Sequence, residues 1–269
     1  MYFGYEDGHP TLNGSGNKTR RLELSDVDPS KSILAQRSDS ERYPELTSLA
    51  SRFRQIRLFR SWAFGRNASG RDPKSADDPN DILDDGEAAK APFGGNIAIL
   101  LSRLLLDSTV HAGVLEHLRE IYAEIDDIRI LTEAGGVQVF VIERGVSFPA
   151  MRLSDGTLRY LCLLAIFCNP RLPPLVCIDE PELGLHPDAM GAVAKLLKEA
   201  SLRTQVIVST HSRVIVDALS QSPEDVVICE KVDGCTQMTR LVAKDLKVWV
   251  DKYSLGELWT RGELGGNRW

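Results

Sequence analysis

The chain has no apolar run that approaches the roughly 20 residues needed to cross a bilayer, so the sequence predicts no membrane-spanning segment. Residues 1–7 also lack the basic and apolar regions of a signal peptide. Basic residues are in deficit, because 32 Lys and Arg against 38 Asp and Glu give a formal net charge of −6. This balance argues against a protein that coats nucleic acid by bulk charge, although a local basic groove stays compatible with it.

Cysteine is scarce as well, with five residues in a chain of 269. The number is odd and three of the cysteines lie in apolar segments, which indicates reduced thiols and predicts a cytoplasmic protein. Cys229 and Cys235 could meet across a hairpin, but no histidine or second cysteine pair supports a metal site there. The length and the 43% hydrophobic content are sufficient for one large domain.

The most informative stretch is Pro174–Pro187, PLVCIDEPELGLHP. Its apolar run, Leu175–Ile178, predicts a strand buried on both faces. The run ends on Asp179 and Glu180 and is followed by a proline, so both acids are expected at the carboxyl end of a central strand, where α/β sheets bind ligands. Such a pair suits nucleotide hydrolysis, with Asp anchoring Mg²⁺ and Glu activating water. The alternative is a strand that merely ends in a charged turn.

Two further segments accompany this stretch. Upstream, Arg152–Arg159 reads RLSDGTLR and leads into an apolar helix expected over Tyr160–Phe167. Downstream, Gln205–Ser212 reads QVIVSTHS, which predicts a second buried strand ending on a histidine. In this order the three segments resemble the signature, the Walker B motif with its D-loop, and the switch-histidine segment of ABC-type ATPases. The resemblance is to the RecF/SMC-like branch of predicted AAA ATPases, whose signature often reads LSDGT.

The resemblance implies an α/β fold, namely a P-loop NTPase core sheet of the ABC-ATPase type with an inserted helical subdomain. We expect residues 1–71 to be the remainder of an N-terminal lobe and residues 72–134 to be a flexible loop and the helical subdomain. Residues 135–269 would then be the part of the ATPase core with the signature, Walker B and the switch histidine.

A Walker A loop, G-x-x-x-x-G-K-[ST], is not found, and the chain has no Gly-Lys pair. The nearest approach, Gly14–Thr19 (GSGNKT), has an Asn before its Lys and lacks the apolar strand and helix expected on either side. In the resembled family this loop lies near the amino terminus, so the chain resembles the carboxyl-terminal two thirds of a head whose P-loop strand and helix are missing. We therefore expect exposed apolar sheet surface and a chain that is inactive alone.

The resemblance also implies roles for single residues. Asp179 would hold Mg²⁺, Glu180 would be the catalytic base, and His211 would hydrogen-bond the γ-phosphate of ATP. The alternative for His211 is a satisfied histidine at a strand end. Gln36 could correspond to the glutamine that senses Mg²⁺ and water, with an ordinary polar loop glutamine as the alternative.

The signature residues Ser154, Asp155 and Gly156 would bind nucleotide at a helix N-terminus, where backbone N–H groups attract anions. An ordinary N-cap is the alternative for Ser154, and both can hold. Arg152 and Arg159 flank this segment, and either could neutralise phosphate or pair with acids. Because two ABC-type heads sandwich two ATPs, the resemblance implies a homodimer that binds ATP and Mg²⁺, with DNA or a partner protein as further candidates.

Hydrophobic periodicity predicts the remaining elements. Helices are expected over 43–53, 96–107, 111–125, 187–202 and 244–253, and strands over 56–60, 137–143, 147–151, 226–231 and 237–242. The leading interpretation is an ATP-hydrolysing head coupled to DNA repair or recombination, in which the DNA part rests on the resemblance alone. The alternative is a truncated, catalytically inactive interaction module that does not bind ATP by itself.

Overall fold

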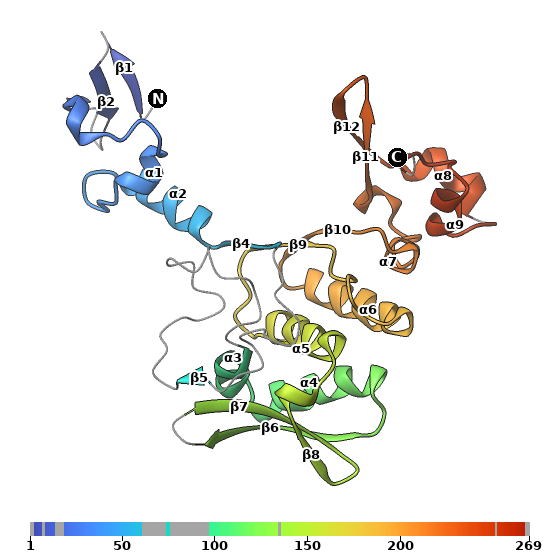
Figure 1. Ribbon diagram of the computed structural model, residues 1–269. Coiled ribbons are helices and arrows are strands. Elements are labelled where there is room, and N and C mark those ends of the chain that lie inside the picture. Colours follow the sequence, from blue (N-terminus) through green and yellow to red (C-terminus); the bar gives the residue numbers. More distant parts are fainter. Residues whose placement is uncertain are drawn as a thin grey trace. The chain divides into compact units, whose positions relative to one another are not determined.

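The computed structural model describes residues 3–6, 9–13, 19–60, 74–75, 97–133, 136–250 and 252–266 (Figure 1). The chain divides into two compact units, Met1–Arg57 with Pro173–Leu175, and Leu58–Leu172 with Val176–Trp269. The predicted boundaries at 71/72 and 134/135 lie outside the described residues, so that division stays a prediction. None of the described helices has the length and apolar character that a membrane span requires.

The smaller unit begins with an antiparallel sheet in the order β1-β2-β3 (Phe3–Glu6, His9–Asn13 and Thr19–Arg21). A single 3-10 turn (Leu24–Asp26) and a short helix α1 (Ile33–Gln36) lead to helix α2 (Pro44–Arg54), which matches the helix predicted over 43–53. The core of this unit consists of apolar side chains from the sheet, from α2 and from the segments between them, namely Leu12, Leu22, Val27, Tyr43 and Leu46.

The strands β2 and β3 flank the segment that comes nearest to a Walker A sequence. Residues 14–18 of that segment lie outside the described residues, but Asn13 and Thr19 on either side are cross-strand partners. A Walker A loop leaves a strand and enters a helix, whereas this segment joins two antiparallel strands. The strand β2 before the segment reads HPTLN and is not the apolar strand that a Walker A loop needs, and strand β3 rather than a helix follows it, in keeping with the sequence expectation.

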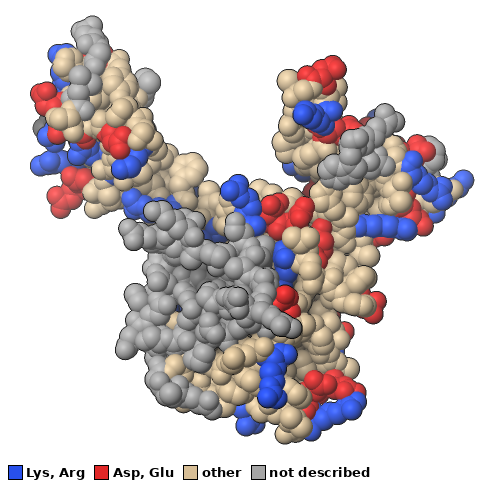
Figure 2. Space-filling view, in the orientation of Figure 1, with Lys and Arg blue, Asp and Glu red and all other residues tan. Residues whose placement is uncertain are grey.

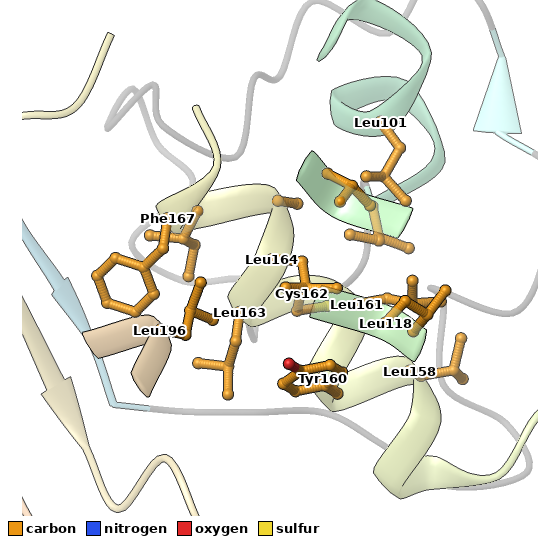
Figure 3. Close-up of a cluster of buried hydrophobic side chains, with 14 of the residues drawn as sticks. Leu101, Leu118, Leu158, Tyr160, Leu161, Cys162, Leu163, Leu164, Phe167 and Leu196 are labelled. Atoms are coloured by element: carbon orange, nitrogen blue, oxygen red, sulfur yellow. The ribbon is translucent and has the colours of Figure 1, made fainter. Parts of the chain in front are cut away.

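The larger unit is organised around helix α5 (Asp155–Phe167), in which every residue from Thr157 to Phe167 is buried. A helix that is apolar on all sides needs cover on all sides. The helices α3 (Ile97–Leu104), α4 (Ser108–Ile121) and α6 (Met190–Ser201) all pack against α5. Figure 3 shows Leu101, Leu118 and Leu196 of these helices around Tyr160 and Leu164 of α5.

The two predicted core strands occur in a sheet of order β10-β9-β4, formed by β10 (Gln205–Ser209), β9 (Leu175–Asp179) and β4 (Ile56–Phe59). Their predicted burial on both faces is wrong. Val176 and Ile178 join the helical core, but Cys177 between them is only half-buried, and Ile207 of β10 is 52% exposed. One face of this sheet packs on helices and the other is open, which produces alternation rather than uniform burial.

A second sheet follows α4 and contains a strand that the sequence analysis missed. It has the order β5-β7-β6 with β8 paired to β7, where β5 is Lys74–Ser75, β6 is Ile125–Glu133, β7 is Gly136–Glu143 and β8 is Val146–Pro149. The predicted pairing of β7 with β8 is confirmed. Helix α4 ends at Ile121 rather than Ile125, so the segment expected to be a helical subdomain also contains β6.

The last lobe contains the predicted hairpin. Its elements are α7 (Arg213–Asp217), β11 (Val227–Val232), β12 (Cys235–Arg240), α8 (Ala243–Val250) and α9 (Leu255–Thr260). In the hairpin Cys229 faces Met238 rather than Cys235, and all five cysteines are free thiols. The fully buried Leu255 forms a small core with residues of α7 and β11, so α9 is anchored on α7.

Candidate active site

The acid pair lies where β9 and β10 end together. The backbone N–H of Glu180 donates to the carbonyl of Ser209 at 3.0 Å and lies 3.2 Å from its hydroxyl. The Ser209 hydroxyl also donates to Asp179 Oδ1. Because Asp179 and Ser209 are the last residues of their strands, both strands finish at one edge of the sheet. The predicted position of the acids, at a strand end, is therefore observed.

Glu180 has an unusual backbone conformation, with φ of +45°. A non-glycine residue in this region costs free energy, and such strain is concentrated at functional sites. The chain turns sharply here, and Leu183 N–H donates to the Glu180 carbonyl at 3.1 Å to close the turn. The sequence around Pro181 predicts that the strand stops, but nothing in it predicts the left-handed residue.

Glu180 and His211 face each other across the ends of the two strands. Glu180 Oε1 lies 3.4 Å from His211 Nε2, and the two side chains are 36% and 55% exposed. The structure thus brings together Asp179, Glu180 and His211, which the sequence analysis had assigned to one site from distant segments. Their individual roles in chemistry stay predictions.

Glu182 is a residue of this site that the sequence analysis missed. Its Oε1 accepts hydrogen bonds from the Thr210 hydroxyl at 2.7 Å and from the His211 backbone N–H at 2.6 Å. Its Oε2 is buried and has no hydrogen-bond partner among the described residues. The signal for it in the sequence is the second acid of the DEPE segment, two residues beyond Glu180.

The structure distinguishes the two arginines beside the signature. Arg159 is only 5% exposed, and its Nη2 donates to the Glu180 carbonyl at 2.8 Å. Burial lowers the pKa of its guanidinium, while the nearby charges of Glu182 and Glu180 oppose that shift. Arg152 is exposed at the end of a 3-10 turn, η4 (Ala150–Arg152). Arg159 therefore contacts the backbone of Glu180 and lies near the charge of Glu182, whereas the choice between the two roles stays a prediction.

The signature residues form the first turn of α5. The Ser154 hydroxyl accepts the Thr157 N–H at 3.0 Å and lies 2.7 Å from the Thr157 hydroxyl, which donates to Tyr122. Ser154 is thus an N-cap, as the alternative interpretation had it. Ser154 and Asp155 are exposed, so the positive end of a long buried helix reaches solvent. Nucleotide binding by these residues stays a prediction.

Gly156 allows a close approach, but to this chain's own backbone. A Cβ atom at Gly156 would lie 3.0 Å from the carbonyl oxygen of Gly184, in the segment Leu183–Pro187 that the resemblance assigns to the D-loop. Gly184 itself has a φ of +78°, which favours glycine. The two glycines therefore bring the first turn of α5 and the D-loop into direct contact.

Gln36 lies in the other unit, and its amide is engaged locally. Its Nε2 donates to the carbonyls of Asp28 and Lys31 at 2.9 and 2.8 Å, and its Oε1 accepts the Asp28 N–H at 2.7 Å. These bonds hold its own loop together and favour the alternative of a structural glutamine. Its predicted role in sensing nucleotide is not tested by this arrangement.

The described residues contain no group of three or more His, Cys, Asp or Glu side chains arranged for a metal ion. Mg²⁺ is usually held by one or two carboxylates together with substrate phosphates and water. The carboxylate of Asp179 and the hydroxyl of Ser209, which are in contact, are oxygen donors of the kind that this ion prefers. The donor set therefore fits Mg²⁺ that arrives with a nucleotide.

The mixed α/β fold has acids and a histidine at the ends of adjacent strands, and together with the family match over residues 3–217 it is of the P-loop NTPase-like class. Residues 3–217 match the family AAA_21, described as "AAA domain, putative AbiEii toxin, Type IV TA system", and the chain belongs to this family. The match includes the signature, the acid pair and His211. It ends at the close of α7, so the hairpin and the last two helices lie beyond it.

Several solved structures are similar to this chain at low identity. The Smc head domain of Pyrococcus furiosus with an extended coiled coil, bound to the C-terminal domain of ScpA, is 18% identical with a TM-score of 0.44. The likeness covers 54% of this chain and 37% of that one. The SMC head domain from Thermotoga maritima is 19% identical with a TM-score of 0.39, covering 54% of this chain and 52% of that one. Scores of this size carry no inference about activity or substrate.

Proposed function

We propose that this chain is an ATP-hydrolysing head of the RecF/SMC-like type. The observation that carries the proposal is the 3.4 Å approach of Glu180 Oε1 to His211 Nε2 at the common end of two strands, with Asp179 alongside. A carboxylate that orients or deprotonates the attacking water and an oxygen ligand for Mg²⁺ are among the groups that phosphoryl transfer uses, and the family resemblance assigns the histidine to the γ-phosphate. Membership of an AAA-domain family supports a nucleoside triphosphate as the ligand.

The proposed reaction assigns one task to each side chain. Glu180 accepts a proton from a water molecule as the water oxygen forms a bond to the γ-phosphorus, and the bond from that phosphorus to the β–γ bridging oxygen breaks. ADP and inorganic phosphate are the products. His211 donates a hydrogen bond to the γ-phosphate while it remains beside Glu180. Asp179 and Ser209 would hold Mg²⁺, which neutralises charge on the phosphate oxygens when bound.

The substitution Glu180→Gln tests this assignment because it removes the base and keeps the shape of the side chain. We expect phosphate release to fall on the order of 10²–10⁴-fold, with little change in the KM for ATP. Glu116→Gln is the matched control, since Glu116 is an exposed glutamate on α4 outside the site. Hydrolysis by Glu180→Gln at the wild-type rate would show that the base lies elsewhere.

The proposal includes a second copy of the chain. In this arrangement the first turn of α5, from Ser154 to Gly156, contacts the γ-phosphate held at Asp179 of the other copy. Its support is the exposed position of Ser154 and Asp155 at the positive end of a buried helix. The D-loop lies directly against that turn, so the two surfaces could change together on dimerisation.

DNA and a partner protein belong to the finer part of the proposal. The DNA role rests on the RecF/SMC-like resemblance, and the formal net charge of −6 limits it to a local contact. In the view of Figure 2 the described residues show basic and acidic side chains interspersed, without a continuous basic face. Stimulation of phosphate release by added duplex DNA tests this part. The family description also names a toxin–antitoxin system. A toxin role that depends on ATP hydrolysis is tested by expression of the chain, which should arrest growth, and by Glu180→Gln, which should relieve the arrest.

One observation favours an alternative function. The segment nearest to a Walker A loop connects two antiparallel strands, with Asn13 and Thr19 paired across them. A chain without a phosphate cradle would be an interaction module that binds no nucleotide alone. Titration calorimetry of the purified chain with Mg-ATP separates the two functions, because the module produces no binding heat and the ATPase does.

A further inference from the structure

We propose that Glu182 is a positioning residue that fixes His211 against Glu180. This inference rests on the proposed ATPase function. It gives a role to Glu182, which the proposed reaction does not use. Glu182 lies two residues after Glu180, and its Oε1 contacts the segment after β10 rather than solvent.

The contacts form two connections between the ends of the strands. The first joins Glu180 N–H to Ser209, at the last residue of β10. The second joins Glu182 to the next two residues, through the Thr210 hydroxyl at 2.7 Å and the His211 N–H at 2.6 Å. The first connection aligns the strands, and only the second restrains the backbone from which the His211 imidazole projects.

The surroundings of Glu182 keep its carboxylate in place. Its Oε2 is buried, and a buried carboxylate is costly unless opposite charge lies near it. Arg159 is that charge, since it is 5% exposed and its electrostatic interaction with Glu182 raises the pKa of the guanidinium against the effect of burial. Arg159 also donates a hydrogen bond to the Glu180 carbonyl. The same guanidinium therefore stabilises the backbone at Glu180 and the carboxylate of Glu182.

Because their surroundings differ, Glu180 and Glu182 are suited to different tasks. Glu180 is 36% exposed and faces the imidazole, which suits a group that exchanges a proton with water. Glu182 has one oxygen engaged by two donors and the other enclosed, so it cannot turn toward a water in the site. Glu182 therefore acts on the reaction through His211 rather than by touching the nucleotide.

The test compares Glu182→Gln and Glu182→Ala with wild type and with the exposed control Glu116→Gln. The first variant keeps an acceptor and loses the charge, and the second loses both. We expect kcat to fall in the order wild type, Gln, Ala, reaching on the order of 10²-fold for Ala, because misplacement by about 1 Å has that effect. The KM for ATP should stay near the wild-type value, since Glu182 does not contact nucleotide.

A second readout needs no activity. A short hydrogen bond to a carboxylate moves an amide proton downfield, so in ¹H–¹⁵N spectra of the nucleotide-free chain the His211 signal should move upfield in Gln and further in Ala. The signals of α6 should not move, which shows that the fold is kept. Should Ala not fold, the Gln variant alone decides.

The two readouts separate the two proposals. An unmoved His211 amide in the Gln variant overturns the positioning role, as does a wild-type kcat in a variant whose amide has moved. If wild type releases no phosphate, the proposed function fails, and the amide shift still decides whether Glu182 holds His211.

Discussion

The two neighbouring acids of this site lie in different environments because each is held by different hydrogen bonds. The Asp179 carboxylate accepts the Ser209 hydroxyl, and Glu180 stands after it with a φ of +45°. Placing a non-glycine residue in that region has a cost of order 1–3 kcal/mol, which bonds to Ser209 and Arg159 offset here. The strain separates the two acids, so that one faces His211 while the other keeps its contact with β10.

The thiols allow a test of burial at the residue scale. Burial raises the pKa of Cys168 to about 12 and that of Cys162 further, whereas Cys229 and Cys235 are exposed. The thiolate is the reactive form, so at pH 8 almost none of it is present at the buried Cys162 and the half-buried Cys168. We expect Cys229 and Cys235 to react first with a disulfide reagent, and Cys162 and Cys168 to react only after unfolding.

Peptide mass spectrometry after timed labelling measures this order. The labelling of Cys168 should stay far slower than that of Cys229 throughout the pH range in which the chain is folded, because its thiol is ionised only near pH 12. Labelling of Cys162 as fast as Cys229 at pH 8 would show that α5 is not the enclosed helix described above.

At the scale of elements, most of the helices and strands of the described regions were predictable from periodicity. The acid pair, the signature helix and the histidine strand have strong local patterns and occur in the expected segments, although α5 starts at Asp155 rather than Tyr160 and β10 ends at Ser209, before His211. The partial exposure of β10 was not predictable from its residues. The apolar run Val206–Val208 is compatible both with a strand in the middle of a sheet and with a strand at its edge, and β10 is the outer strand in the sheet order β10-β9-β4. Strand β6 was missed because Asp126 and Asp127 interrupt its alternation.

The packing of α9 on α7 matters because α7 begins two residues after His211. Gly256 N–H donates to Asp217 at 2.7 Å, and Arg213 bridges Asp217 and Glu257 at 3.5 and 3.2 Å. A Cβ atom at Gly256 would lie 2.5 Å from Arg213 Cγ and 2.6 Å from its carbonyl oxygen. Only glycine permits this approach between the two helices.

Gly256→Ala should therefore destabilise the protein by about 1–3 kcal/mol, the usual effect of overpacking. Gly191→Ala is the matched control, because Gly191 lies in α6 and a Cβ there would meet nothing within 4 Å. It should stabilise the protein by about 0.5–1 kcal/mol, as helical Gly to Ala changes do. Urea unfolding of both variants measures the difference, and equal free energies of unfolding would contradict the α7–α9 contact.

At the scale of the whole molecule, the candidate site lies in the larger unit, which has its own core. Sequence resemblance placed Asp179, Glu180 and His211 together because each belongs to a recognisable segment. Arg159 is named by the sequence without a choice between its two roles, and Glu182 is not singled out, since the partners of both residues lie in other segments and no local pattern encodes those contacts. Gln36 belongs to the other unit, where its amide holds its own loop.

The central claim is that a triphosphate is hydrolysed between the acid pair of one copy and the signature turn of another. Mixing two variants tests it most directly. Glu180→Gln removes the base, and Ser154→Arg blocks the exposed turn, so each should be inactive alone. In a mixed dimer, one site would contain both changes and the other neither.

The decisive measurement is phosphate release by an equal mixture of the two variants after they are allowed to exchange copies. The account predicts recovery to about a quarter of the wild-type rate, since half of the dimers are mixed and each has one intact site. A mixture as inactive as its components, beside an active wild type, would contradict a site shared between two copies.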